Sequence, residues 1–437
     1  MSKVAVIQAG GKGTRLKELT GDSIPKPLLA LNGKPMIQWQ IECMKRYGID
    51  SFVIITGYLG EKIEEYFGDG TSLGVKISYI RESAETPLGS AGALYYWREQ
   101  VKPEDEILLI FGDVMFDINV DRMVAFHEEK NALATLLIHP NSHPFDSDLV
   151  MVDGNSCVTG FDSKNNTRDY WYDNLVNAGL YILSGELLEL IKEPVKTDLE
   201  KDILFGLVDS KRLYGYRTCE YVKDAGTVDR FKRVSADQAD GVWAARNLSK
   251  PQKCVFLDRD GTINKDRGLV FKEDLLELED VAAKAIARLN NSGYLTIVVT
   301  NQPVVARGMC EISDVENIHK KLAVLLGREG AYVDDITFCP HHPDKGYPEE
   351  NPIYKIKCNC RKPATGMIDE MVKKYNIDLS QSYMIGDSTI DVQTGINAGV
   401  KTILVHTGVN SGDGKYDVKA DYEAADLMAA VDIILGE

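Results

Sequence analysis

Two aspartates separated by a single residue follow an apolar run in the second half of the chain. The run at residues 255–257 continues directly into D-R-D-G-T at residues 258–262. A carboxylate can attack a phosphate monoester and carry the phosphoryl group, while a second carboxylate can protonate the leaving oxygen and then activate water. Enzymes accelerate the hydrolysis of such esters by up to about 10²¹-fold. The spacing of Asp258 and Asp260 therefore predicts phosphate-ester chemistry at the end of a strand.

Candidate magnesium ligands, a cation and hydrogen-bond donors for a phosphate group follow later in the chain. Asp387 and Asp391, in I-G-D-S-T-I-D, are candidate magnesium holders, because magnesium prefers oxygen ligands. Lys362, in C-R-K-P, can neutralise the phosphate. Thr300 and Asn301 end another apolar run and can donate hydrogen bonds to the phosphate oxygens.

These motifs resemble the haloacid dehalogenase superfamily of phosphatases. The order D-x-D-G-T, T-N, K-P and G-D-x-x-x-D is the order of that superfamily, over residues 254 to about 408. The resemblance implies that Asp258 is the nucleophile, that Asp260 is the acid and base, and that Thr300 and Lys362 contact the phosphate. It also implies a magnesium ion held by Asp258, Asp387 and the backbone carbonyl of Asp260.

Three cysteines and a histidine between residues 339 and 360 predict a zinc site. The sequence reads C-P-H at 339–341 and C-N-C at 358–360, which supplies four nitrogen and sulfur ligands suited to tetrahedral zinc. His342 competes with His341 as the fourth ligand. A structural metal would hold the turn-rich segment between the two ligand pairs in one shape. The predicted ligands are Cys339, His341, Cys358 and Cys360.

The block C-P-H-H-P followed by C-N-C-R-K-P resembles the zinc-bearing phosphatases of heptose bisphosphate. Those enzymes remove the 7-phosphate and leave a sugar 1-phosphate. Arg307 and Arg361 are candidates for binding the distal phosphate of the bisphosphate as bidentate hydrogen-bond donors. His341 is preferred over His342 because of the same resemblance. A histidinol-phosphate phosphatase shares most of these motifs and remains an alternative.

The first half of the chain contains a glycine loop and a lysine between two prolines. After the apolar residues 4–7 comes A-G-G-K-G-T-R-L at 9–16, and P-K-P-L follows at 25–28. Glycines let backbone N–H groups approach a triphosphate, and Arg15 and Lys26 add fixed cations. The spacing fits neither the P-loop of ATPases nor the dinucleotide fingerprint. The loop glycines in question are Gly10, Gly11 and Gly13.

The two motifs together resemble the sugar-1-phosphate nucleotidyltransferases over residues 3 to about 235. In such enzymes a sugar phosphate attacks the α-phosphate of a nucleoside triphosphate, so that positioning and charge neutralisation suffice without a protein nucleophile. The resemblance implies a base-binding loop and following helix at 85–94, with Leu88 and Gly89 near the nucleotide. The other implied residues are Asp113 and Asp224 for magnesium, and Asn177 and Gly179 for the sugar.

Strand and helix patterns alternate through both halves, which places these motifs on α/β domains. Apolar runs predict strands at 4–7, 52–55, 75–80, 107–111, 132–138, 179–183, 254–257, 295–300, 336–338, 383–385 and 402–405, and a hairpin at 151–161. Helical spacing appears at Ile37, Ile41 and Met44. We therefore predict two α/β domains, each a mainly parallel sheet with helices on both faces. The resemblances imply that the first is Rossmann-like and the second haloacid dehalogenase-like. Ligands then bind at the carboxyl ends of the strands.

Length and composition support two enzymatic domains. The chain has 437 residues, and a polar stretch at 236–252 is the expected linker between domains at 1–238 and 252–437. The net charge of −16 argues against nucleic acid, and no apolar run reaches the ~18 residues of a membrane span. The uneven spacing of eight cysteines fits a reducing cytoplasm better than disulfides. We expect small-molecule substrates and no membrane or nucleic-acid partner, and leave a homo-oligomer open.

The two resemblances together predict consecutive reactions on one chain. The phosphatase would convert D-glycero-D-manno-heptose 1,7-bisphosphate into the 1-phosphate, and the transferase would add GMP from GTP to give GDP-heptose, a precursor of surface glycans such as lipopolysaccharide. Two rivals remain. In one, the first domain is a non-catalytic sugar-nucleotide sensor. In the other, a CDP-, dTDP- or UDP-sugar transferase is fused to a histidinol-phosphatase-like unit.

Overall fold

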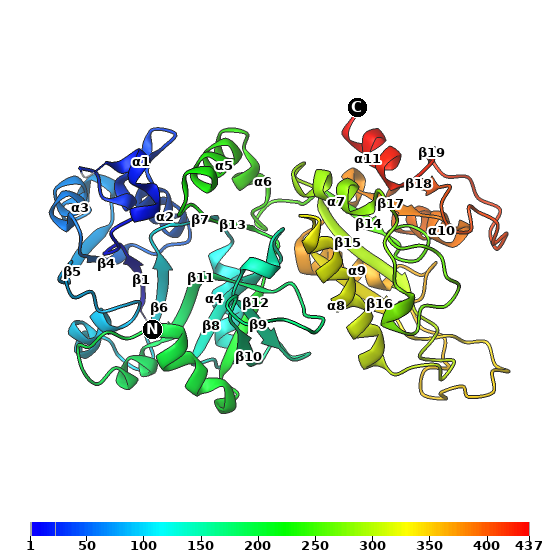
Figure 1. The fold of residues 1–437 in the computed structure, drawn as a ribbon, viewed down its shortest axis with the longest axis horizontal. Helices are drawn as coiled ribbons and strands as arrows, with labels where there is room; N and C mark the ends of the chain where they lie inside the picture. The colour runs from blue at the N-terminus through cyan, green and yellow to red at the C-terminus, as the bar shows by residue number, and fades with distance from the viewer. Residues whose placement is uncertain (1, 22, 437) are drawn as a thin grey trace. The chain divides into compact units, whose positions relative to one another are not determined.

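The computed structural model describes residues 2–21 and 23–436, and these form two compact units. The first unit comprises Met1–His139, Val150–Asp162 and Asn177–Asn247, and the second comprises Pro140–Leu149, Ser163–Val176 and Leu248–Glu437. The last change from one unit to the other falls between Asn247 and Leu248, inside the segment expected to hold the linker. Much of that segment is nevertheless helical, because α5 (Val228–Ala239) and α6 (Val242–Ala245) occupy it and bury Val234 and Trp243. Each unit is described separately below (Figure 1).

The second unit is built on a parallel sheet. Among the described residues it has six strands in the order β16-β15-β14-β17-β18-β19, and all five neighbouring pairs run parallel. The strands are β14 (Cys254–Leu257), β15 (Leu295–Asn301), β16 (Asp335–Cys339), β17 (Tyr383–Gly386), β18 (Lys401–Val405) and β19 (Tyr422–Ala424). Strand β14, the first of the six along the chain, lies in the middle of the sheet. The segment that follows β14 therefore begins at the centre of the edge formed by the carboxyl ends of the strands.

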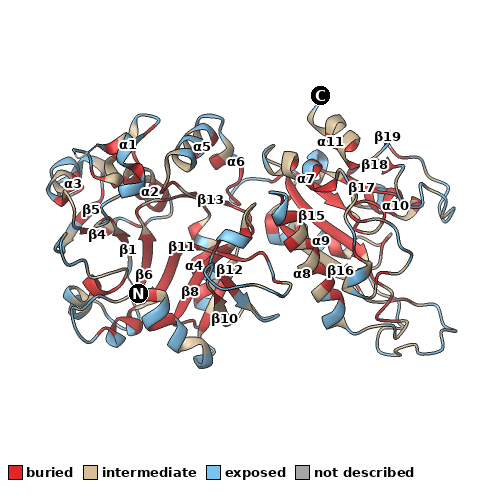
Figure 2. Ribbon diagram, in the orientation of Figure 1, coloured by how far each residue is buried: buried red, intermediate tan, exposed pale blue. Residues whose placement is uncertain are grey.

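Helices cover both faces of this sheet. They are α7 (Ala282–Asn290), α8 (Ile312–Arg328), α9 (Gly366–Tyr375), α10 (Thr389–Ala398) and α11 (Leu427–Leu435). Adjacent residues of β18 point to opposite sides. Val405 shares a core with α7, α8 and α11, whereas Leu404 shares one with Val392 of α10. Figure 2 shows the result, with buried strands between helices whose outer surfaces are exposed.

The first unit is built on a larger, mixed sheet. Within residues 2–21 and 23–436 the sheet has nine strands, with the path β10-β9-β11-β6-β1-β4-β5 and with β8 joining β11 to β12. Strand β1 pairs in parallel with β4 and β6, while β11 runs antiparallel to β6 and β9. The strands are β1 (Lys3–Gln8), β4 (Ser51–Thr56), β5 (Lys76–Arg81), β6 (Glu106–Phe111), β8 (Ala134–His139), β9 (Leu149–Val152), β10 (Val158–Asp162), β11 (Val176–Ser184) and β12 (Leu213–Arg217).

The elements around this sheet include helices on one face and two small ribbons. The core against β1 contains residues of α2 (Met36–Arg46), α3 (Gly60–Phe67) and α4 (Val120–Glu129). The predicted helical residues Ile37, Ile41 and Met44 are all fully buried in it, which confirms that pattern. The ribbons are β2 (Ala30–Leu31) with β3 (Lys34–Pro35), and β7 (Val114–Asp117) with β13 (Tyr221–Asp224). Sequence patterns did not predict β7, β12 or β13.

The α/β class is confirmed for both units, and the predicted strands appear with boundaries within two residues in most cases. The antiparallel pairing of β11 with β6 and β9 makes the first sheet mixed, while β6, β1, β4 and β5 run parallel as predicted. In the part of the chain that the structure describes, no helix has the length and apolar character needed to cross a bilayer.

Candidate active sites

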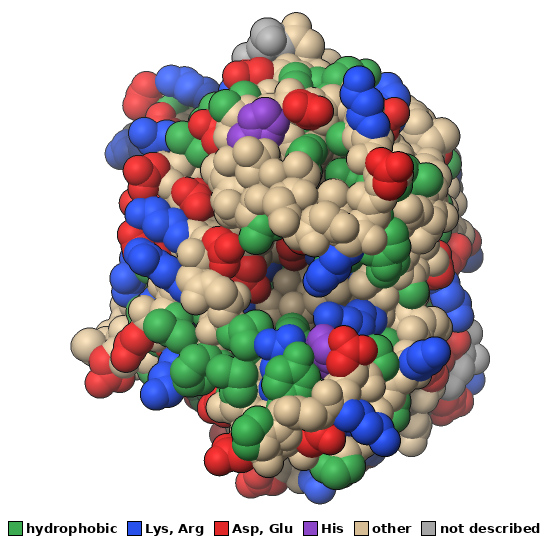
Figure 3. Space-filling model, turned by 90° about the vertical axis from the view of Figure 1, so that its right-hand side faces the viewer, with side chains coloured by type: hydrophobic (Ala, Val, Ile, Leu, Met, Phe, Trp, Pro, Cys, Tyr) green, Lys and Arg blue, Asp and Glu red, His purple; other side chains and the backbone are tan. Residues whose placement is uncertain are grey.

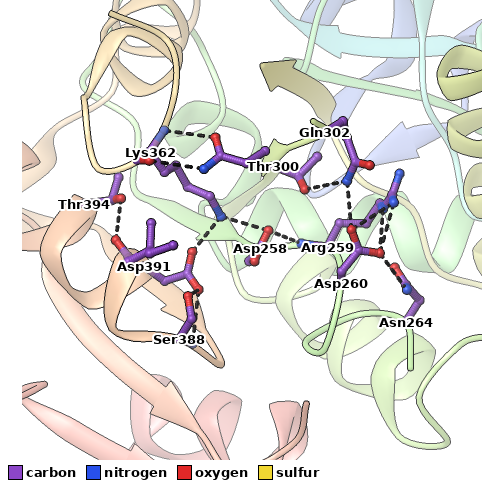
Figure 4. A network of polar contacts seen from close by, with 12 residues as sticks. Asp258, Arg259, Asp260, Asn264, Thr300, Gln302, Lys362, Ser388, Asp391 and Thr394 are labelled. Carbon is purple, nitrogen blue, oxygen red and sulfur yellow. Dashed lines mark hydrogen bonds and ion pairs between the residues drawn. The ribbon is translucent and has the colours of Figure 1, made fainter. Parts of the chain in front are cut away.

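A buried lysine joins two aspartates at the centre of the second sheet. Asp258 follows β14, and its Oδ1 lies 2.8 Å from the Nζ of Lys362. The same nitrogen donates to Oδ1 of Asp391, at 2.6 Å, in the first turn of α10. The side chains of Lys362 and Asp391 are 2% and 1% exposed, so the ion pairs are shielded from water. Figure 4 shows Lys362 reaching between the two carboxylates.

A third carboxylate, that of Asp387, leaves this cluster with excess negative charge. Oxygen atoms of Asp258, Asp387 and Asp391 lie within 4.8 Å of one another. Burial, and then repulsion by Asp391, raises the pKa of Asp258 to about 6, although Lys362 opposes the shift. Burial, followed by repulsion from Asp258 and Asp391, raises the pKa of Asp387 to about 8. Three carboxylates facing one ammonium group form a donor set that fits a divalent cation with oxygen ligands.

Asp260 is held apart from that cluster by nitrogen donors. Its Oδ1 accepts from Nη2 of Arg259, at 2.9 Å, and from Nδ2 of Asn264, at 3.0 Å. Its Oδ2 accepts from the same Arg259 nitrogen, at 2.9 Å, and from Nε2 of Gln302, at 2.8 Å. Asp258 and Asp260 therefore leave the same strand end in different environments, one beside a lysine and the other inside a cradle of N–H groups (Figure 4).

Thr300 and Asn301 end β15 beside the same edge, but their side chains have different partners. The Oγ1 of Thr300 accepts from Gln302, at 3.0 Å. The Oδ1 of Asn301 instead accepts from the backbone N–H of Lys362, at 3.0 Å, and its Nδ2 donates to the backbone carbonyl of Lys362, at 3.1 Å. Asn301 also lines a cavity, so its predicted contact with phosphate stays a prediction, and its side chain fixes the segment that carries Lys362.

A cavity of about 180 Å³ opens between these side chains. Its lining residues are Asp258, Asp260, Gly268, Leu269, Val270, Thr300, Asn301, Gln302, Pro303, Arg361, Lys362, Ser388, Ile390 and Asp391. Arg361 is therefore at the cavity, although its Nη1 donates to the carbonyl of His341, at 3.0 Å. Arg307 does not line the cavity, and its guanidinium lies 4.4 Å from the ring centre of Tyr347. Figure 3 shows that the surface of this unit is hollowed, with acidic and basic side chains at the hollow.

The predicted zinc ligands lie together. The Sγ atoms of Cys339, Cys358 and Cys360 are 3.2–3.6 Å apart, and Nδ1 of His341 is 3.3 Å from Cys360 and 3.6 Å from Cys339. Zinc bonds of about 2.0–2.3 Å would place tetrahedral ligands at about this separation. His342 points elsewhere, because its Nδ1 accepts from the backbone of Asp344. The donor set and its spacing fit a closed zinc site at the segment that leads into Arg361.

In the first unit, the glycine loop lies directly against Lys26. Gly13 has a φ of +60°, and a β-carbon there would lie 2.7 Å from the β-carbon of Lys26. Glycine is needed at this position for both reasons, since other residues pay a steric cost in the left-handed region. The loop is followed by a short 3₁₀ turn (Thr14–Leu16) and α1 (Lys17–Thr20). Lys26 forms an ion pair with Asp113.

Arg15, Asp113 and Asp224 meet at Gly226. A β-carbon on Gly226 would lie 2.7 Å from Asp224, 3.0 Å from Arg15 and 3.2 Å from Asp113. The β7–β13 ribbon explains this meeting, because Asp224 pairs in register with Val114, the residue after Asp113. Asp224 also accepts from Arg230 of α5, at 2.7 Å. Two carboxylates and several cations at one point could bind a metal and the phosphates that it bridges.

The residues predicted to bind the sugar and the nucleotide base contact other segments of the first unit through hydrogen bonds and close packing. Nδ2 of Asn177 donates to Glu200, at 2.8 Å, and to the hydroxyl of Tyr181, at 2.9 Å. Gly179 has a φ of +73° and packs against Phe111. The backbone N–H of Leu88 donates to Glu82, at 2.9 Å. Gly89 is at φ +76° against Thr197, and the helix that follows the loop is a 3₁₀ helix (Gly92–Tyr96).

Four residues around Asp260 were not predicted from the sequence: Arg259, Asn264, Gln302 and His319. Two signals were available. Arg259 stands between the two motif aspartates, and His319 falls on the apolar stripe of α8 with Val315 and Leu322. Nothing in the sequence indicates that these two side chains meet, because they are separated by 60 positions.

Comparison with known proteins agrees with both halves of this description. The family model described as nucleotidyl transferase matches residues 4–241, and the one described as HAD-hydrolase-like matches residues 359–430. The chain is 42% identical over 142 residues to a D-glycero-beta-D-manno-heptose-1,7-bisphosphate 7-phosphatase of Haemophilus ducreyi, covering 32% of this chain and 75% of that protein. It is 32% identical over 217 residues to a UTP--glucose-1-phosphate uridylyltransferase of Synechocystis, and 31% identical over 240 residues to a mannose-1-phosphate guanylyltransferase of Mycobacterium tuberculosis.

The chain spans 55% and 65% of the lengths of these two transferases, and they cover 47% and 54% of it. Because the first family model matches more than half of its residues, the chain belongs to the nucleotidyl transferase family. It also belongs to the family of the D-glycero-β-D-manno-heptose-1,7-bisphosphate 7-phosphatases, since it covers three quarters of a relative at 42% identity. It is thus an enzyme with a nucleotidyltransferase unit and a phosphatase unit.

Proposed function

We propose that the second unit removes the 7-phosphate of D-glycero-D-manno-heptose 1,7-bisphosphate and leaves the 1-phosphate. The observation that carries the chemistry is the buried ion-pair cluster of Lys362 with Asp258 and Asp391 at the cavity. The heptose substrate is supported by the phosphatases that the chain resembles.

The residues of this site have distinct proposed roles. Asp258 attacks phosphorus and forms an aspartyl-phosphate, and Asp260 gives a proton to the leaving oxygen and later takes one from water. Lys362 and Thr300 contact the transferred phosphoryl group. A bound Mg²⁺ would be held by Asp258, Asp387 and the carbonyl of Asp260, and would offset the charge of carboxylates and phosphate.

A structural zinc ion is proposed for the loop beside the cavity. Cys339, His341, Cys358 and Cys360 would hold it, and the short spacing of their donor atoms supports this. The zinc would fix the segment containing Arg361, which faces the cavity and is a candidate for the distal phosphate. Arg307 remains a candidate only if the loop that carries Tyr347 rearranges on binding.

We propose that the first unit transfers a nucleotidyl group, GMP from GTP, to the heptose 1-phosphate with release of pyrophosphate. Arg15 and Lys26 would bind the triphosphate, with the backbone of Gly10, Gly11 and Gly13. Asp113 and Asp224 would hold Mg²⁺, which is supported by their meeting at Gly226. The guanine base is supported by the mannose-1-phosphate guanylyltransferase that the chain resembles, and the resemblance to a UTP--glucose-1-phosphate uridylyltransferase makes UTP the alternative donor.

The two reactions fit one sequence of steps. The phosphatase leaves a sugar 1-phosphate, which is what a sugar-1-phosphate nucleotidyltransferase consumes. We propose catalytic domains at 1–238 and 252–437, a cytoplasmic setting, and a GDP-heptose product for surface glycans.

Two variants test the division of labour. Asp258→Asn should abolish release of orthophosphate from the bisphosphate but leave transfer to supplied heptose 1-phosphate intact. Lys26→Ala should lose transfer and keep orthophosphate release. Loss of both activities in both variants would contradict two independent sites, and loss of neither would contradict the assigned residues.

A further inference from the structure

Arg259 is the largest fully buried side chain of the protein's described residues, and it lies between the two aspartates of the phosphatase site. A buried guanidinium is costly unless its charge and its N–H groups are matched. Arg259 meets that need through Asp260: Nη2 donates to both carboxylate oxygens, at 2.9 Å each, and Nε donates to Oδ1, at 3.2 Å. Among the described residues, the carboxylate that pairs with this side chain is that of Asp260, the proposed acid and base.

The other end of the guanidinium is fixed by His319 of α8. Nη1 of Arg259 lies 3.2 Å from Nε2 of His319, which is itself buried. Arginine has no acceptor, so this nitrogen of His319 must accept, and the ring must be neutral. Burial, and then the charge of Arg259, lowers the pKa of His319 well below its usual value, in agreement with a neutral ring. The His319 ring packs edge-on against Phe338 of β16, so the contact is anchored in the core.

The cradle leaves the Asp260 carboxyl group little freedom. Both of its oxygens accept from N–H donors, which come from Arg259 and from the amides of Asn264 and Gln302 (Figure 4). Gln302 also donates to Thr300, so the cradle connects to the strand end that faces the phosphate. Rotation of the carboxyl group would break several of these hydrogen bonds together. The orientation of Asp260 is therefore set by its neighbours rather than by its own rotamer preference.

We propose that Arg259, fixed by His319, is a positioning residue that sets the geometry of proton transfer by Asp260. This inference rests on the proposed phosphatase function. In the first step the Asp258 oxygen forms a bond to phosphorus, the bond from phosphorus to the leaving oxygen breaks, and that oxygen takes the proton of Asp260. In the second step Asp260 takes a proton from water, the water oxygen bonds to phosphorus, and the bond to Asp258 breaks to release orthophosphate.

Leaving-group dependence separates positioning from general structural support. A p-nitrophenolate departs without protonation, whereas the more basic phenolate depends on an acid. The value of kcat/KM reports the steps up to the first irreversible one, so it is insensitive to the later use of Asp260 as a base. Arg259→Lys keeps the positive charge but loses the planar fork. It should lower kcat/KM for phenyl phosphate by about 10²-fold, within the range of general acid catalysis, and change that for p-nitrophenyl phosphate little.

Two further variants cover the case in which Arg259→Lys does not fold. His319→Leu removes the acceptor and should give a smaller loss with the same selectivity for phenyl phosphate. His319→Gln returns an acceptor and should restore much of the activity. Arg288→Lys is the matched control, because Arg288 lies on α7, pairs with Asp432 and is 31% exposed, and both substrates should be unaffected.

The outcomes separate this inference from the proposed function. Asp260→Asn should itself show the selective loss with phenyl phosphate. If it slows both substrates equally, the proposed role of Asp260 fails. If Asp260→Asn is selective but the Arg259 and His319 variants slow both substrates equally, or neither, then Asp260 is the acid and Arg259 does not position it.

Discussion

Replacing Lys362 with methionine should destabilise the second unit strongly, because it removes the cation shared by two buried carboxylates. Nζ lies 2.8 Å from Asp258 and 2.6 Å from Asp391, and the lysine side chain is 2% exposed. Burial alone would lower the pKa of Lys362, but the charges of Asp258 and Asp391 raise it, so the ammonium form is retained. Breaking a buried ion pair by removal of one partner costs about 3–5 kcal/mol. For a unit of this size, each kcal/mol lowers Tm by about 2–4 °C, so the expected decrease is roughly 6–20 °C.

Calorimetry without added magnesium measures this effect as the decrease in Tm of the variant relative to the unchanged protein. Lys374→Met is the matched control. Lys374 also pairs with an aspartate, Asp335, at 2.7 Å, but the lysine is 42% exposed. Asp335 keeps the hydrogen bond from the hydroxyl of Tyr375, so loss of the lysine should cost at most about 1 kcal/mol. Lys362→Met should also lose phosphatase activity. Equal decreases in Tm for the two variants would refute the reasoning, because burial would then not have strengthened the Lys362 ion pairs.

Three further predictions concern the metals and the glycine loop. Cys360→Ser should weaken zinc binding, measured by metal analysis of the purified protein. It should also lower phosphatase activity and leave transferase activity unchanged. A full zinc content in this variant would contradict the assignment of Cys360 as a ligand. Gly13→Ala should lower the free energy of unfolding of the first unit by about 1–2 kcal/mol, measured by urea unfolding, because residue 13 has a positive φ. Gly11→Ala should not lower it, because a β-carbon at residue 11 would have no atom within 4 Å. In magnesium-free buffer the second unit should lose stability as pH rises from about 5 to 8. The pKa values of Asp258 and Asp387 are raised to about 6 and 8, so the folded state binds more protons than the unfolded state in this interval. Added Mg²⁺ should therefore raise Tm more at pH 8 than at pH 5.5, and an equal rise at both values would contradict a site built on these carboxylates.

The central strands could be predicted from sequence because burial on both faces of a parallel sheet leaves continuous apolar runs. Residues 254–257 were predicted as a strand and form β14 with the same boundaries. The β7–β13 ribbon was missed because its two strands pair across more than a hundred positions, which no local pattern shows. That ribbon brings Asp113 and Asp224 together, so the sequence indicated the residues but not the element that positions them.

The candidate sites show the same division between local and long-range information. The grouping of Cys339, His341, Cys358 and Cys360 could be predicted because two cysteines two residues apart, together with a Cys-x-His pair, are typical of zinc sites. The partners of Asp260 could not, since Arg259 and His319 meet only through the packing of α8 on the sheet. Asn301 shows the same limit. Its residue type suits a phosphate donor and it lines the cavity, but its contact with the backbone of Lys362 is visible only in the fold.

The most direct test of the account is a one-pot reaction with D-glycero-D-manno-heptose 1,7-bisphosphate, Mg²⁺ and each nucleoside triphosphate in turn, followed by phosphorus NMR. We predict equal amounts of orthophosphate and nucleotide-heptose, with pyrophosphate released and GTP as the preferred donor. Orthophosphate without a sugar nucleotide from any of the four triphosphates would contradict the consecutive reactions. Absence of orthophosphate would contradict the phosphatase assignment to Asp258.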